Sequence, residues 1–123
     1  MTVTTEVDAE ALLVRQHIEG TLSVAELGMH IDRIIADPQV TEEFGTLSYV
    51  GDLSNALDED ERALFADHLR RLGTHGPRKC AVVCKRALNV ATTRFFLETA
   101  DLDPLRMRAF DNETEALEWL RGS

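Results

Sequence analysis

The chain has 123 residues, of which 44% are hydrophobic, and its 22 acidic and 13 basic residues give a formal net charge of −9. This length suits one packed domain, and the ordinary apolar fraction excludes the disordered and fibrous classes. No apolar run approaches the roughly 20 residues that span a bilayer, the N-terminus lacks a signal-peptide pattern, and phosphate binding needs positive potential. We expect one cytoplasmic domain over residues 1–123, without membrane insertion or a nucleic-acid partner.

The N-terminal part of the chain predicts a strand and then a helix. Residues 11–18 begin apolar and then alternate, which is typical of a strand, and residues 3–7 are a weaker candidate for a strand before it. Ser23 and Glu26 have the spacing of a capping box at the start of a helix. The helix should end at Asp37, because a residue before proline avoids helical backbone.

The middle of the chain repeats this order. Residues 46–50 predict a strand, and residues 58–72 predict a helix with acids in its first turn and Arg70 and Arg71 in its last. Both placements complement the helix dipole. The apolar stripe that we expect to face inward consists of Phe65, Leu69 and Leu72.

Two further strands and two further helices follow. Residues 80–84 are a short apolar run, as expected for a strand covered on both faces, and residues 105–110 alternate. Residues 87–99 predict a helix, and Asn112 should cap the last one. The expected inward residues of these helices are Leu88, Ala91 and Phe95, and then Ala116, Leu117 and Leu120.

Alternation of strand and helix predicts an α/β fold. We expect a single domain with a mainly parallel sheet of four to five strands, flanked by four helices and joined by right-handed crossovers.

Three segments between residues 12 and 120 resemble the SpoIIAA-like branch of the STAS fold, which is grouped with small STAS/SEC14 domain-containing proteins. They are residues 34–38, Ile-Ile-Ala-Asp-Pro; residues 50–53, Val-Gly-Asp-Leu; and residues 107–120, which end in Glu-Trp-Leu. The resemblance implies a STAS-like fold with a non-enzymatic regulatory or protein-interaction role. The alternative that it implies is a SEC14-like protein that binds a small molecule or a lipid headgroup.

STAS antagonists of anti-sigma factors carry a phosphorylated serine where the second helix begins. The corresponding stretch here is Leu57-Asp-Glu-Asp60, which has no serine and already carries negative charge. We therefore expect no phosphosite at this position.

The chemistry-bearing residues show no catalytic or metal-binding pattern. Cys80 and Cys84, four residues apart on a strand, would stand roughly 13 Å apart, beyond disulfide reach. We interpret them as small buried hydrophobic residues. The four histidines lack ligand spacing, and there is no nucleophile elbow. We expect no enzyme activity, no catalytic residue, no metal and no cofactor. The histidines are His17, His30, His68 and His75.

The remaining candidate site is geometric. Ligands of open parallel sheets bind outside the carboxyl ends of the strands, at a switch point in strand order. The polar residues expected there could hold a small anionic ligand. An alternative is that the cations only keep the strand soluble and that Ser54 only forms a turn. The candidates are Asp52, Ser54, Lys85, Arg86 and Arg94.

The charge is distributed unevenly along the chain. Residues 70–97 hold seven basic side chains and no acid, so we expect acids to meet them. Those acids would come from the second helix or from a second copy in a homodimer, with Phe96 and Trp119 as apolar contacts. The sequence does not identify any other protein partner. The basic residues are Arg70, Arg71, Arg78, Lys79, Lys85, Arg86 and Arg94.

Overall fold

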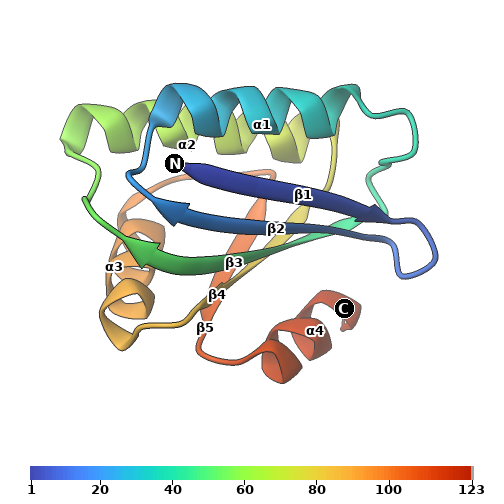
Figure 1. The fold of residues 1–123 in the computed structure, drawn as a ribbon. Coiled ribbons are helices and arrows are strands. Elements are labelled where there is room, and N and C mark those ends of the chain that lie inside the picture. The colour runs from blue at the N-terminus through green and yellow to red at the C-terminus, as the bar shows by residue number, and fades with distance from the viewer. Residues whose placement is uncertain (123) are drawn as a thin grey trace.

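A five-stranded sheet with helices on both faces forms the domain (Figure 1). The computed structural model describes residues 1–122. Every strand and helix expected from the sequence is present, with bounds that differ by a few residues, and the weaker candidate at residues 3–7 forms the first strand. The elements are β1 (Thr2–Asp8), β2 (Leu13–Gly20), α1 (Val24–Ala36), β3 (Gly45–Leu53), α2 (Glu59–His75), β4 (Lys79–Cys84), α3 (Ala87–Thr99), β5 (Arg106–Phe110) and α4 (Glu113–Arg121).

The sheet is mixed, so the prediction of a mainly parallel sheet is wrong. The strand order is β1-β2-β3-β4-β5, and β1 pairs with β2 in antiparallel register while β2 to β5 are parallel. The reason is the short connection between β1 and β2, in which Leu12 has a φ of 55°. Parallel strands need a crossover of a dozen or more residues, so these two strands can pair only as a hairpin. The strand order also runs from β1 to β5 without reversing, so the sheet lacks the switch point at which the sequence analysis expected a ligand.

Local capping explains where the helices begin. The Ser23 side chain accepts a hydrogen bond from the backbone N–H of Glu26 at the start of α1. Asp58 and Glu61 form a reciprocal capping box at the start of α2. Asn112 accepts from the N–H of Glu115 in α4. These side chains satisfy backbone donors that the first turn of a helix leaves unpaired.

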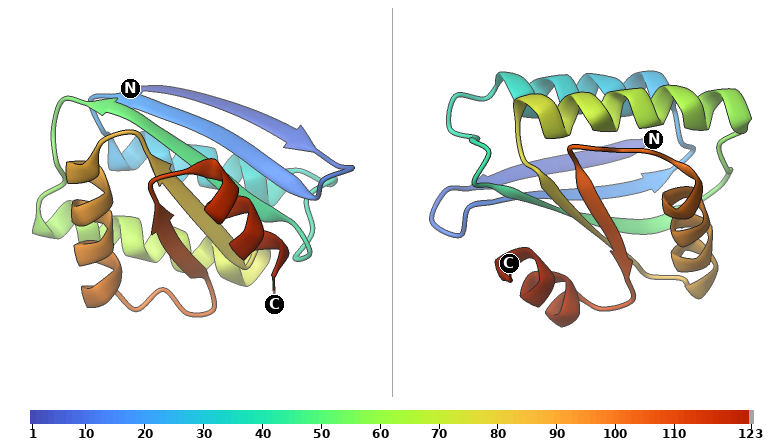
Figure 2. Two further views of the ribbon diagram at one scale, coloured as in Figure 1. Left: turned by 90° about the horizontal axis from the view of Figure 1, so that it is seen from below. Right: turned by 180° about the vertical axis from the view of Figure 1, so that it is seen from behind.

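Helices lie on both faces of the sheet (Figure 2), and each face has its own core. Helices α1 and α2 cover one face, and the buried residues of α3 belong to the same cluster, which includes Ile31, Leu69 and Val82. Helix α4 covers the other face, where Leu47 and Ala116 are buried in a smaller cluster. No helix within residues 1–122 combines the length and the apolar character that a membrane span requires.

Helix α3 presents a different face to the core from the one that we expected. Leu88 and Phe95, predicted to be internal, are 75% and 62% exposed, and Ala91 is exposed as well. Val90 and Phe96 are buried instead, and the ring of Phe96 stacks on Phe65 with centroids 5.8 Å apart. Because α3 carries apolar residues around most of its circumference, tertiary packing rather than periodicity selects the buried face.

Acids elsewhere in the fold meet much of the basic stretch, as expected. Only Asp67 comes from α2, whereas the other carboxylates come from α1, from the loop before β3 and from β3. Phe96 is buried in the core, so its predicted role as a dimer contact is wrong. The ion pairs are Arg70–Asp67, Arg71–Asp32 (2.7 Å), Arg78–Glu42 (3.0 Å) and Arg86–Asp52 (2.6 Å).

Candidate ligand-binding site

A cavity of about 470 Å³ lies between the sheet and the helices α1, α2 and α3. Its volume falls within the range of about 300–1,000 Å³ that is typical of small-molecule sites. Alternate residues of the parallel strands face it, including Ile18, Val50 and Val82. The stripe on α2 that was predicted to face inward supplies a further wall through Phe65 and Leu69. Most of the cavity is therefore apolar.

One part of the sheet that lines the cavity is polar, and the sequence analysis missed it. Gln16, Thr46 and Ser48 are all buried on this face of β2 and β3. The Ser48 hydroxyl donates to Gln16 Oε1 over 3.5 Å, and Gln16 Nε2 donates to Thr5 Oγ1 over 3.3 Å. Thr46 Oγ1 has no hydrogen-bond partner within residues 1–122. We call Gln16, Thr46 and Ser48 the polar floor.

A sequence signal for the polar floor was available. Gln16 alternates with Val14 and Ile18, and Thr46 and Ser48 precede Val50 at the same two-residue spacing. Polar residues on the core-facing side of a strand are the unusual ones, because most buried positions are apolar.

Both cysteines are buried and free, as we interpreted them. Cys80 pairs in register with Thr46 and lines the cavity. Burial raises the pKa of its thiol to about 12, against an opposing hydrogen bond with Ser48. Burial also raises the pKa of the Cys84 thiol. Both groups are therefore neutral thiols near pH 7 and poor nucleophiles.

The cavity is bordered at the carboxyl ends of the parallel strands by two loops and α3. The N–H of Leu22 donates to Asn55 Oδ1 over 2.6 Å, and this bond joins the loop after β2 to the loop after β3. Arg62 Nη1 donates to the carbonyl of Leu57 over 2.8 Å. Leu88 and Phe95 of α3 also line the cavity although they are largely exposed. We call this border the mouth.

The predicted site residues are brought together only in part. Arg86 Nε donates to Asp52 Oδ1 over 2.6 Å, and Arg86 holds the pKa of that carboxyl below its usual range, with a smaller effect from Lys85. Ser54 lines the cavity and shares a 2.7 Å hydrogen bond with Thr21. Arg94 forms no ion pair with any residue that the structure describes. An anion site at this edge stays a prediction.

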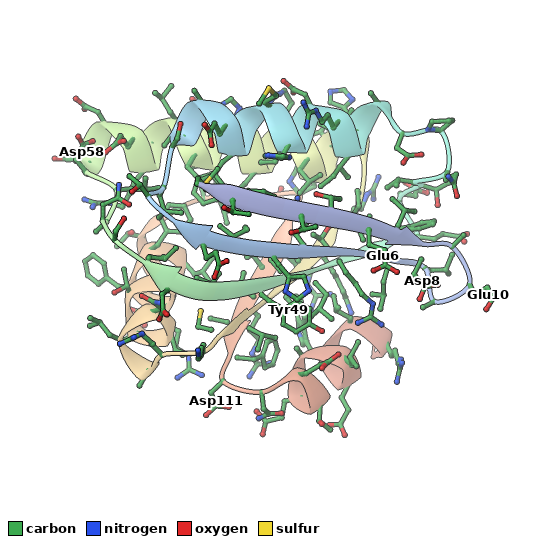
Figure 3. The ribbon with its side chains drawn as sticks, in the orientation of Figure 1. Glu6, Asp8, Glu10, Tyr49, Asp58 and Asp111 are labelled. Carbon is green, nitrogen blue, oxygen red and sulfur yellow. The ribbon has the colours of Figure 1, made fainter. Side chains whose placement is uncertain are left out.

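A second polar cluster lies on the opposite face, where Tyr49 projects toward α4 (Figure 3). Its hydroxyl donates to Glu113 Oε1 over 2.6 Å, and Arg15 lies 3.4 Å from both groups. The His17 ring stacks on Tyr49 with centroids 4.6 Å apart. Burial and then Glu113 raise the pKa of Tyr49. These contacts link α4 to the sheet, which is a structural role.

The acidic side chains are dispersed. Asp58 begins α2, Asp111 precedes α4, and Glu6, Asp8 and Glu10 lie around the β1–β2 turn (Figure 3). Among residues 1–122, no group of three or more His, Cys, Asp or Glu side chains could hold a metal ion.

Comparison with known proteins identifies the fold. No family model matches the chain, and no curated protein matches its sequence. Among solved structures, the chain is similar to an uncharacterized protein of the DUF3478 family, with a SpoIIAA-like fold, from Shewanella loihica PV-4. The TM-score is 0.61 at 16% identity, over 97% of this chain and 92% of that one. The fold is therefore SpoIIAA-like, as the three segments predicted.

Proposed function

We propose that this SpoIIAA-like domain is a non-enzymatic binding module that holds a small, largely apolar molecule in the cavity beneath α2 and α3. The observation that carries the proposal is the cavity itself, which has apolar walls and a small set of buried polar groups. That combination is the usual composition of a small-molecule site.

The residues around the cavity support binding rather than catalysis. None of the described lining residues is an aspartate or glutamate, and the Cys80 thiol stays protonated near pH 7. His30 also lines the cavity, but no described hydrogen bond joins it to an orienting acid. In an activated-nucleophile arrangement, the base that assists the nucleophile is itself oriented by such a partner.

Fluorescence of the neutral apolar probe N-phenyl-1-naphthylamine tests the proposal. We expect saturable binding to the purified protein with enhanced emission, and we expect Leu88→Ser to weaken it. Leu88 borders the mouth and is 75% exposed, so its replacement should leave folding intact. Removing part of its apolar contact, worth about 1 kcal/mol, should lower affinity roughly fivefold.

The matched control is Leu64→Ser on α2. Leu64 is 55% exposed and does not line the cavity, so this variant should bind the probe like the wild type. Absence of saturable binding would contradict the proposal, and so would equal losses in both variants.

A second candidate function is a regulatory module that acts through protein contacts, and the exposed apolar side chains of Leu88 and Phe95 favour it. A second copy of the chain is the simplest partner, because two-fold dimers are the commonest oligomers. Sedimentation at micromolar concentration should then show a dimer that Phe95→Ser dissociates. A monomer at both low and high salt would exclude self-association.

A further inference from the structure

The hydroxyl of Thr46 is buried without a hydrogen-bond partner. Thr46 lies near the start of β3, its side chain is among the most deeply buried in the protein at 1% exposure, and Oγ1 has no partner within residues 1–122. A buried donor without an acceptor destabilises a fold. Valine has nearly the same shape and would avoid that cost. Thr46 therefore lowers the stability of the fold relative to valine at this position, unless its hydroxyl forms a hydrogen bond with a ligand.

The hydroxyl belongs to the cavity rather than to the α4 face. Thr46 lines the cavity, whereas its neighbour Leu47 is buried in the cluster beneath α4. Leu53 at the carboxyl end of β3 also lines the cavity, roughly 23 Å along the strand at about 3.3 Å per residue. A molecule that enters at the mouth would therefore reach Thr46 with its leading end.

The neighbouring polar groups have hydrogen-bonding capacity to spare. The Ser48–Gln16 and Gln16–Thr5 bonds, at 3.5 and 3.3 Å, are longer than the usual 2.7–3.2 Å range and therefore weak. Cys80, in register with Thr46, contributes only a neutral thiol. The polar floor can therefore accommodate a further polar atom without breaking a strong bond.

The chemistry around Thr46 selects a neutral group. Gln16, Thr46 and Ser48 are all uncharged, and the arginine that lines the cavity, Arg62, bonds to Leu57 in the loop at the mouth. A carboxylate or phosphate at the polar floor would be desolvated without a cation, which is strongly unfavourable. The desolvation of a ketone, ester or ether oxygen costs much less free energy, and such an oxygen can accept a hydrogen bond from a hydroxyl.

We propose that the ligand is an apolar molecule with a neutral oxygen acceptor at its buried end, and that Thr46 donates a hydrogen bond to this oxygen. The proposal rests on the proposed binding function and adds the chemical class and orientation of the ligand. The apolar remainder of the molecule lies against Phe65 and Phe96 and extends toward Leu88 at the mouth.

The test uses two probes that differ by the acceptor, 2-octanone and octane, titrated into the protein and followed by NMR. We expect Thr46→Val to weaken the binding of 2-octanone about tenfold, which corresponds to about 1.4 kcal/mol, because the buried ketone oxygen then has no hydrogen-bond donor. The same variant should change the affinity for octane by less than twofold, because octane has no acceptor. The matched control is Thr74→Val on α2, because the Thr74 hydroxyl donates to the Arg70 carbonyl and Thr74 does not line the cavity. This control should bind both probes as tightly as the wild type does.

The outcomes separate the two proposals. If Thr46→Val binds 2-octanone as tightly as the wild type does, the acceptor proposal is wrong while the binding function stands. An equal loss of affinity for both probes in Thr46→Val also overturns the role of Thr46. If neither probe binds the wild type, the binding function fails and the acceptor proposal fails with it. Urea unfolding of Thr46→Val adds a ligand-free readout, because the variant should be at least as stable as the wild type. A large loss of stability would show that the hydroxyl already has a partner.

Discussion

The Cys80 thiol should make the stability of the fold depend on pH in the alkaline range. Burial raises its pKa from 9.0 to about 12, so the folded protein keeps this proton while the unfolded chain releases it. Below pH 9 both states are protonated and the thiol contributes its full share of stability. As the pH rises above 9 the unfolded state binds fewer protons, so the free energy of unfolding falls. The slope approaches about 1.4 kcal/mol per pH unit, which gives a loss of about 2 kcal/mol by roughly pH 10.5.

Urea unfolding of the wild type and of Cys80→Ala across pH 8 to 10.5 measures this effect. Tyr49 and Cys84 also have raised pKa values, but they titrate in both proteins, so the difference between the two curves isolates Cys80. Cys80→Ala should be the less stable protein at pH 8, because it loses buried contacts, and the gap should shrink by about 2 kcal/mol at the alkaline end. Parallel curves would refute the reasoning.

Two other predictions concern the packing of the fold, and a third concerns phosphorylation. Gly73→Ala should lower the free energy of unfolding by about 1–3 kcal/mol, because the added Cβ would stand 2.6 Å from the Leu105 backbone nitrogen; a gain in the urea midpoint would contradict this contact. Val82→Asp should abolish cooperative thermal melting, since an unpaired charge buried in β4 costs several kcal/mol; unchanged melting would mean that the position is not internal. Mass spectrometry of protein from its native cells should find no phosphate between residues 53 and 63, and stoichiometric phosphate on Ser54 would restore a kinase-linked switch.

Local signals were sufficient to predict most of the fold. Ser23 and Asn112 cap helices through contacts within three residues, and Asp37 ends α1 just before a proline. Such effects depend on neighbours in the chain, so they can be recognised without tertiary structure.

One error concerns a tight turn, and the other concerns a contact between distant residues. The antiparallel pairing of β1 depends on a turn that contains Leu12 at positive φ. Few non-glycine residues adopt this backbone conformation, so a leucine in the sequence does not indicate it. The buried face of α3 depends on the stacking of Phe96 against Phe65, which lies on another helix. The helix itself was predicted correctly, but the face that it turns toward the core was not.

The anion site predicted at the carboxyl ends of the strands stays a prediction, and the structure adds an apolar cavity that the sequence analysis did not predict. We proposed Lys85 and Arg86 because they are cations at the carboxyl end of β4. In the structure, Arg86 forms an ion pair with Asp52. The walls of the cavity are mostly apolar, and among its buried polar groups it is the Thr46 hydroxyl that has no hydrogen-bond partner within residues 1–122. An uncharged threonine on a strand is common, and only the three-dimensional structure reveals that its hydroxyl lacks a partner.

The central claim is that an apolar molecule binds between the sheet, α2 and α3. Methyl NMR spectra of the protein, recorded during titration with 2-octanone, test it most directly. We expect shift changes and ligand contacts at Leu69 and Val82, which line the cavity, and no change at Leu117 and Leu120, which belong to α4 and pack on the opposite face of the sheet. Saturable changes confined to the α4 face, or no saturable change at all, would contradict the account.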